Sequence, residues 1–195
     1  MFMYKKSHHV LGKHLANIYF SQLPDRYCRA FVTGCVQPDK NPTTYLKGSL
    51  RKKWLSGHNF TNSRRYMRRL ICRLGRKDRW HLWDYYTLGK LLHYTADAFT
   101  GAHNPQFRGN LTEHRAYEKK LHNHILSQLS RPPHDCLSQK GEVMESLCAY
   151  HKKYSRLPML PTTDATFCIA ASHMVMRELT APAGKTEQFP AFSSV

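Results

Sequence analysis

Apolar residues recur along most of this chain at intervals of three and four, the spacing of one face of an α-helix. In the segment 7–20, Val10, Leu11, Leu15, Ile18 and Tyr19 form such a stripe. We expect further helices over residues 59–74, 78–99, 112–129, 140–154 and 163–179. No stretch alternates apolar and polar residues for long enough to predict a strand. The pattern predicts an all-α protein, a multi-helix bundle around one core.

Three predicted helices begin near a residue that can cap a helix N-terminus, namely Ser7, Asp78 and Thr112. The length of 195 residues suits one domain. We expect that domain to cover residues 1–180, and residues 181–195 to form a flexible tail.

Between the first two predicted helices lies the segment TGCVQPDKNPTT. Its Gly34, Pro38 and Pro42 are unfavourable inside a helix. Asp39 is therefore expected on a loop.

Charge adds a second feature, because 30 Lys and Arg residues against 13 Asp and Glu give a net charge of +17. The predicted helix 59–74 carries four of these cations on its outer side: Arg64, Arg65, Arg68 and Arg69. Such an excess favours phosphate-bearing partners such as lipid headgroups, nucleotides or nucleic acid. A basic but unspecialised surface is an equally open interpretation.

Several protein classes are disfavoured by what the sequence lacks. The six cysteines form no C-x-x-C pair, so neither a zinc ribbon nor a dithiol redox motif is indicated. No run of about 20 apolar residues could span a membrane. The first residues, MFMYKKSHHVLGKHL, have no apolar segment after their basic residues. We expect a cytoplasmic protein with reduced thiols.

Two pairs of imidazole and carboxylate residues carry the candidate chemistry. His93 and Asp97 are four residues apart on one predicted helix, and His114 and Glu118 repeat that spacing on the next. Residues four apart lie on the same helix face, so each pair can reach one ion. His103 stands in the turn between them. Imidazole with carboxylate is a donor set for zinc and also for manganese or iron.

Two interpretations of these pairs remain open at this point. They can be intrahelical ion pairs, each contributing a few tenths of a kcal/mol at the surface. Alternatively, they can hold two or three cations that activate a water and neutralise a leaving oxygen in phosphoester hydrolysis.

The segments HYTADAFTGAHN and EHRAYE resemble the zinc-dependent phospholipase C family. The shared pattern is H-Y-x-x-D, a histidine six residues after that Asp, and then H-x-x-x-E. Upstream, SHHVLGKHLA, GCVQPDKN and GHNFTNS are similar to the family's opening helix, its Pro-Asp loop and a further histidine segment. The resemblance covers about the first two thirds of the chain and implies that family's all-α bundle.

The resemblance also implies a set of metal ligands. Around one zinc ion it groups Asp39, His58, His93 and Asp97. A second ion would be held by His103, His114 and Glu118, and a third by His8 together with Asp97. His8 follows Ser7 as in the family's opening helix, but His9 and His14 are alternatives.

Two of these residues have further roles or alternatives. Asp39 would also be catalytic, orienting or deprotonating the attacking water, whereas its plain alternative is a turn residue after Pro38. His58 could equally be a loop histidine. Secreted members use a processed amino-terminal residue at the third metal. This chain starts at Met1, so we expect the third site to be altered or absent.

The predicted function is a zinc-dependent phosphoesterase, similar to phospholipase C, that hydrolyses a phosphodiester or phosphomonoester with a metal-activated water. Its substrate would be a phospholipid or a soluble phosphoester, and its basic helix could lie on an anionic membrane. One alternative is a nuclease of the related trinuclear zinc class, with Trp83, Tyr85, Tyr86 and Phe107 stacking on bases. Another is a non-catalytic metal-binding protein.

Overall fold

Seven α-helices and one short 3-10 turn make up the part of the chain that our computed structural model describes, residues 5–40, 59–104, 107–130 and 142–180. In chain order they are α1 (Lys5–Tyr19), α2 (Asp25–Lys40), α3 (Phe60–Gly75), α4 (Leu82–Ala98), η2 (Gly101–His103), α5 (Leu111–Leu129), α6 (Val143–Tyr154) and α7 (Pro161–Thr180). No strand occurs in these ranges. The predicted all-α bundle is confirmed, whereas the predicted tail after residue 180 lies outside the described residues.

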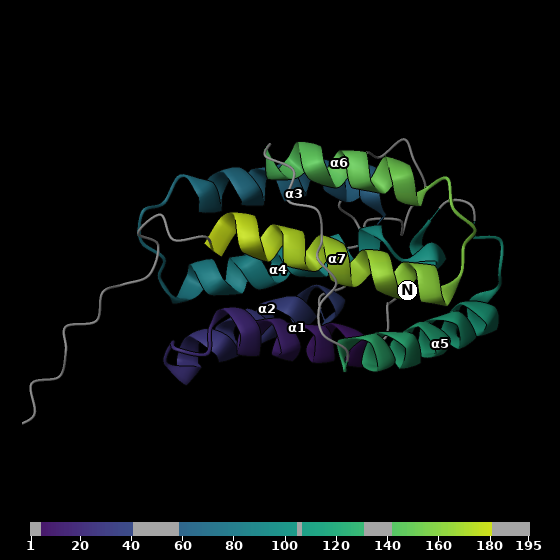
Figure 1. The fold of residues 1–195 in the computed structure, drawn as a ribbon, viewed down its shortest axis with the longest axis horizontal. Helices are drawn as coiled ribbons and strands as arrows, with labels where there is room; N and C mark the ends of the chain where they lie inside the picture. Colours follow the sequence, from purple (N-terminus) through teal and green to yellow (C-terminus); the bar gives the residue numbers. More distant parts are fainter. Residues whose placement is uncertain (1–4, 41–58, 105–106, 131–141, 181–195) are drawn as a thin grey trace, which may run out of the picture.

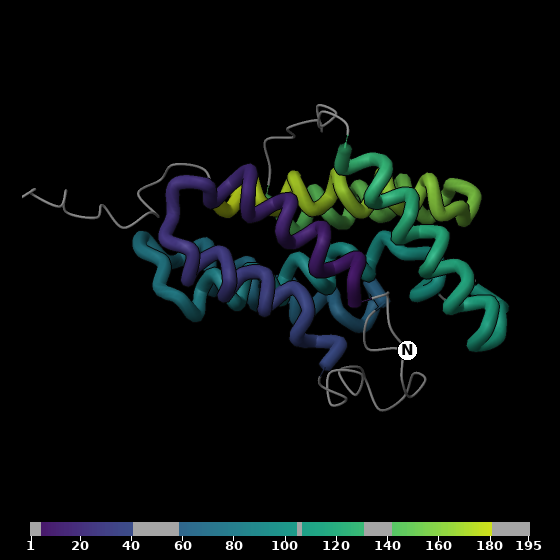
Figure 2. The backbone as a smooth tube through the Cα atoms, turned by 90° about the horizontal axis from the view of Figure 1, so that it is seen from below, coloured from purple at the N-terminus to yellow at the C-terminus, as the bar shows by residue number. Residues whose placement is uncertain are grey.

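The helices lie in three tiers along the long axis of the molecule (Figure 1). α3 and α6 form the upper tier, α4 and α7 the middle one, and α1, α2 and α5 the lower one. Seen from below, α1 and α5 run obliquely side by side (Figure 2). α4 packs against α2, α3, α7 and α1. It is therefore the central helix, and its two candidate metal ligands, His93 and Asp97, lie in the core.

The crossing of α2 and α4 depends on two glycines. A Cβ atom on Gly34 would lie 2.1 Å from the carbonyl oxygen of Tyr86, and one on Gly89 would lie 2.1 Å from that of Phe31. Neither position has room for any side chain, so the two backbones can approach closely. This contact brings the C-terminal ends of α2 and α4 to one place.

The prediction that Asp39 lies on a loop is wrong. α2 continues through Gly34 and Pro38 and ends at Lys40, so Asp39 belongs to its last turn. Pro38 is close to the helix end, where only few backbone hydrogen bonds remain to be lost. Gly34 is stabilised by the packing against α4. Tertiary contacts therefore override the local preference for a loop.

The predicted cap at Ser7 is also wrong. α1 begins at Lys5, and Ser7 is buried within it. The Ser7 Oγ atom forms a 2.9 Å hydrogen bond with His122 Nδ1 on α5. Ser7 thus joins two helices instead of starting one.

Two further caps are displaced by a few residues. α4 begins after His81, not at Asp78, and the Asp84 carboxylate accepts a hydrogen bond from the His81 backbone N–H. α5 begins after Asn110, whose Oδ1 accepts hydrogen bonds from the backbone N–H groups of Thr112 and Glu113. Cap positions depend on backbone conformation, which spacing alone does not determine. The other predicted helices lie within three residues of α3, α6 and α7.

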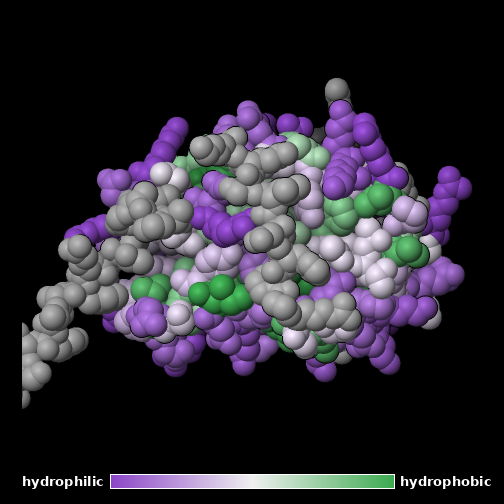
Figure 3. All heavy atoms as spheres, viewed as in Figure 1, coloured by the Kyte–Doolittle hydropathy of each residue, from purple (hydrophilic) through white to green (hydrophobic). Residues whose placement is uncertain are grey.

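The molecular surface is largely hydrophilic on the face shown in Figure 3, where hydrophobic residues appear as separate small patches. Among the described helices, none combines the length and apolar character needed to cross a bilayer.

Candidate metal centre

His93 and Asp97 on α4 form the middle of a buried polar cluster. Their exposed fractions are 0% and 1%. His93 Nδ1 forms a 2.9 Å hydrogen bond with the carbonyl oxygen of Cys35 on α2. The carbonyl only accepts, so Nδ1 carries the proton. In the neutral ring Nε2 then has a lone pair, and it lies 3.1 Å from Asp97 Oδ2. A cation bound between that lone pair and the Asp97 carboxylate would stabilise the arrangement.

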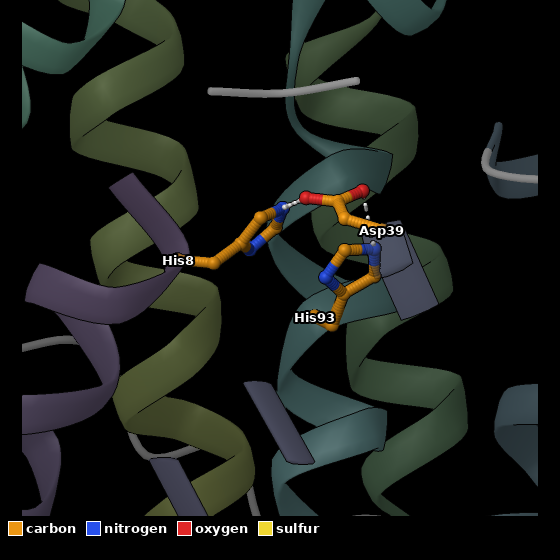
Figure 4. Close-up of side chains that lie close together, drawn as sticks. All are labelled: His8, Asp39 and His93. Atoms are coloured by element: carbon orange, nitrogen blue, oxygen red, sulfur yellow. Dashed lines mark ion pairs between the residues drawn. The ribbon is translucent and has the colours of Figure 1, made fainter. Parts of the chain in front are cut away.

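His8 and Asp39 complete the first group of possible ligands (Figure 4). His8 Nε2 lies 3.2 Å from Asp97 Oδ1 and 3.9 Å from Asp39 Oδ2, and the second Asp39 oxygen is 3.6 Å from His93 Nε2. The rings of His8 and His93 stack with their centroids 3.9 Å apart. α1, α2 and α4 thus each contribute to one buried site.

The second group consists of His103, His114 and Glu118. His103 ends η2, and the other two residues lie one turn apart on α5. His114 Nε2 is 3.0 Å from Glu118 Oε1, and His103 Nε2 is 3.8 Å from the same oxygen. His103 Nε2 also lies 3.6 Å from Asp97 Oδ1. Asp97 therefore stands between the two groups, as a bridging carboxylate would.

The electrostatic environment of the cluster favours a cation. Asp39 and Asp97 are each the last residue but one of their helices, α2 and α4, where the helix dipole is negative and disfavours a carboxylate. Burial raises the pKa of Glu118, with a smaller contribution from the charge of Asp97, and the neighbouring His114 partly offsets this. His8 Nε2 is buried and makes no hydrogen bond within the described residues. The donor set of imidazoles and carboxylates fits zinc.

A second buried carboxylate supports the same region without belonging to it. Asp164, in the first turn of α7, is fully buried. Its Oδ2 accepts hydrogen bonds from the Gly101 backbone N–H at 2.5 Å and from the Tyr117 hydroxyl at 2.7 Å, and its Oδ1 accepts one from the Tyr154 hydroxyl at 2.7 Å. Gly101 starts the turn that carries His103, and Tyr117 precedes Glu118. Asp164 therefore fixes the second group's turn against α5.

Close packing leaves little freedom at this turn. A Cβ atom on Gly101 would lie 2.3 Å from Met159 Cγ and 2.7 Å from the Tyr117 hydroxyl. Burial, with a further contribution from Asp164, raises the pKa values of Tyr117 and Tyr154, so both remain hydroxyl donors at neutral pH. The position of His103 is thus set by side chains from three other helices.

An open hollow of about 510 Å³ lies beside the second group. Apolar Phe107, Tyr117 and Pro161 line it together with the cationic Arg108 and Lys120 and the anionic Glu113. The Phe107 ring packs edge-on against His114, with centroids 5.6 Å apart. A substrate carrying both an anionic and an apolar part would fit such a lining.

Seven of the eight predicted ligands are therefore brought together: His8, Asp39, His93, Asp97, His103, His114 and Glu118. His58 lies outside the described residues. The two alternatives for His8 point elsewhere, because His9 is exposed and the His14 ring packs against His173 at 5.9 Å. In contrast to the grouping that the resemblance implies, His8 lies in the same group as Asp39 and His93.

Sequence reasoning missed the supporting residues Ser7, His122 and Asp164 and the carbonyl group of Cys35. No spacing rule connects Asp164 to Gly101, 63 residues away. The first-turn position of Asp164 on a predicted helix was visible, but it is equally typical of an exposed acidic residue.

Comparison with known proteins identifies a family match. The model of a family described as zinc dependent phospholipase C matches residues 7–173. Neither a curated protein nor a solved structure matches the chain. The matched range begins one residue before His8 and includes every residue of both groups.

Proposed function

Because this chain belongs to the zinc-dependent phospholipase C family, we propose that it hydrolyses a phosphoester at a centre of two or three zinc ions. One observation carries the proposal: four imidazoles and three carboxylates from α1, α2, α4, η2 and α5 converge in the interior. Burying so many polar groups is costly unless cations compensate the carboxylates.

We assign the ligands by their groups. His8, Asp39 and His93 would hold one ion, and His103, His114 and Glu118 another, with Asp97 within reach of both. His58 remains a proposed further ligand, and a third ion remains part of the proposal. Bound zinc would lower the pKa of a water and neutralise charge on the phosphoryl oxygens.

Asp39 is the residue that we propose to orient the attacking water and accept its proton. Asp39 as a whole is only 2% exposed, and its carboxylate oxygens face His8 and His93. A plain turn aspartate would be solvated, and it would not sit inside a helix. The position of Asp39 on α2 therefore supports a role at the site.

The finer choice of substrate is between a phospholipid and a soluble phosphoester. The hollow next to His114 is lined by aromatic rings and by two cations beside one acid, Glu113, so it offers contacts to a phosphate carrying an apolar group. The nuclease alternative loses one of its stacking residues, because Tyr85 is 3% exposed and packs on Phe20, Tyr27 and Trp80. We therefore favour the phospholipid.

Metal analysis of the purified protein tests the first step of the proposal. We expect at least two equivalents of tightly bound divalent ion, and fewer than two would rule out the multinuclear centre. Hydrolysis of phosphatidylcholine, single-stranded DNA and a chromogenic phosphodiester, measured side by side, then tests the reaction. Hydrolysis of none of the three by metal-loaded protein would favour the non-catalytic alternative.

A further inference from the structure

One face of α4 runs from solvent into the metal centre. Trp83, Tyr86, Lys90, His93 and Asp97 are separated by three or four residues and therefore share a side of the helix. Trp83 is 70% exposed, Tyr86 and Lys90 are half-buried, and the last two belong to the metal centre. At a rise of 1.5 Å per residue, Trp83 is ~15 Å from His93 along the helix. The outer half of this face is therefore on the same side of α4 as two residues of the proposed site.

One side of α3 lies beside this face of α4 and extends the surface. Tyr66, Arg69 and Arg73 share one side of α3, and the Tyr66 ring packs against that of Tyr94, so this side lies next to α4. Lys90 Nζ lies 5.7 Å from the Tyr66 ring centre and 5.8 Å from that of Tyr86. The Trp83 and Tyr86 rings meet edge to face at 5.5 Å. Together these contacts join the two helices into one surface.

We call this surface the α3–α4 face and define it by seven residues: Tyr66, Arg69, Arg73, Leu82, Trp83, Tyr86 and Lys90.

The α3–α4 face is cationic. α3 contains no Asp or Glu, and the two arginines that belong to the face, Arg69 and Arg73, are exposed, as are the arginines at positions 64, 65 and 68 elsewhere on α3. At the start of α4, Asp84 is buried and bound by Lys77 at 2.7 Å, so its charge is compensated. Asp78 is an exposed acidic residue in the connection between the helices. The excess of positive charge is complementary to an anionic surface.

The side chains of this face suit a bilayer better than a nucleic acid. Trp and Tyr are enriched at membrane–water interfaces, and Arg and Lys can keep their charge among headgroups. Leu82, 43% exposed beside Trp83, adds aliphatic surface that bases would not use. The rings of Tyr66 and Tyr86 each already have Lys90 over one side, which hinders stacking of bases.

We propose that the α3–α4 face binds the surface of an anionic lipid bilayer, with Trp83 at the depth of the headgroups. The lipid would then lie on the same helix face as His93 and Asp97. The idea that this contact delivers substrate rests on the proposed function, but the binding itself does not.

Co-sedimentation of the full chain with vesicles tests the proposal. Vesicles of phosphatidylcholine alone are compared with vesicles containing about one third phosphatidylserine. We expect binding to the anionic vesicles only, decreasing as salt is added. The double variant Arg69→Glu/Arg73→Glu should bind at least about tenfold more weakly. Lys152→Glu/Lys153→Glu makes the same charge change at exposed residues of α6, which are not part of the face, and should bind nearly as well as the native protein.

Tryptophan fluorescence locates the contact. Anionic vesicles should shift the emission to shorter wavelength, because Trp83 moves from water towards the headgroups. Trp83→Phe should remove this shift while retaining most of the binding, because Phe remains apolar. Circular dichroism identifies any variant that fails to fold. Because Trp83 is exposed, Trp83→Phe should still fold and can test the proposal even if a double variant does not.

Three outcomes would overturn the proposal: equal binding to both kinds of vesicle, equal losses in the two double variants, or binding of single-stranded DNA without binding of vesicles. Hydrolysis of a soluble chromogenic phosphodiester reports on the metal centre independently. A protein that hydrolyses the phosphodiester but does not bind vesicles would contradict the proposed membrane contact and leave the proposed function standing. A protein that binds vesicles without hydrolysing any phosphoester would contradict the proposed function and leave the membrane contact standing.

Discussion

Two buried carboxylate clusters in this molecule are satisfied in opposite ways: Asp164 with its donors, and Asp39 with Asp97. Asp164 stands at the N-terminus of α7, where the helix dipole favours negative charge, and it accepts three hydrogen bonds. Asp39 and Asp97 stand at C-terminal ends, where the dipole is unfavourable, and imidazole nitrogens face them. The first cluster has its donors within the protein, whereas the second is arranged to accept a cation.

This difference distinguishes a structural carboxylate from a candidate metal ligand by its surroundings alone, without comparison to other proteins. Equal burial does not distinguish them, because Asp164 and Asp97 are 0% and 1% exposed. The identity of the nearest atoms does: hydroxyl and amide hydrogens surround Asp164, whereas imidazole nitrogens that can bind a metal through a lone pair face Asp97. Substitutions in the two clusters should therefore behave differently with and without metal.

The largest effect is expected from Asp97→Asn. Removing the carboxylate between the two groups should lower phosphoester hydrolysis more than about 100-fold. This exceeds the loss of activity that is usual when a residue that only hydrogen-bonds a metal ligand is replaced. The assay is hydrolysis of a chromogenic phosphodiester with metal content measured in parallel. Asp25→Asn, at an exposed position of α2, makes the same chemical change as a control. Unchanged activity in Asp97→Asn would contradict the proposed centre.

Removing the metal should affect the native protein next most strongly. A ligand present at about 1,000 times its dissociation constant stabilises the folded state by about 4 kcal/mol. A chelator should therefore lower the melting temperature of the native protein clearly, and that of Asp97→Asn much less. Calorimetry with and without chelator measures both. If the two proteins lose the same stability, Asp97 does not hold the ion.

Asp164→Asn should destabilise the protein whether or not metal is present. Three hydrogen bonds to a carboxylate weaken together, and we expect the free energy of unfolding to fall by about 3 kcal/mol. Denaturant titration of the metal-free protein measures this. Tyr117→Phe, which removes only one of the bonds, should cost about half as much. A loss that appears only in the metal-loaded protein would place Asp164 among the ligands instead.

The smallest effect concerns His173, a buried imidazole on α7. Among the described residues its neighbours are Tyr19, His14 and Arg177, and none of them is a carboxylate. Burial lowers its pKa to about 4. The unfolded state, with a pKa near 6.5, takes up the proton first as the pH falls, so stability is lost between about pH 6.5 and 4. His173→Gln should reduce the loss between pH 7 and 5 by about 1 kcal/mol. An unchanged pH dependence of unfolding would show that His173 is solvated.

Helices with a regular apolar stripe were predictable because their periodicity is a local property. α3, α6 and α7 lie within three residues of their predicted ranges. α2 was missed because Gly34 and Pro38 disfavour a helix locally, and only the close contact with Gly89 and Tyr86 explains the glycine. Caps at His81 and Asn110 were missed by a few residues, since several neighbouring side chains could have served.

The sequence by itself determined the two imidazole–carboxylate pairs on α4 and α5, because residues four apart on a helix must lie together. It also determined the family, through residues 7–173. Only the tertiary structure decided that His8 stacks on His93, that Asp39 is a helix residue facing both, and that Asp97 stands between two groups. It also decided that Asp164 anchors the turn of His103. These relations join positions far apart in sequence, and they depend on how closely helices pack.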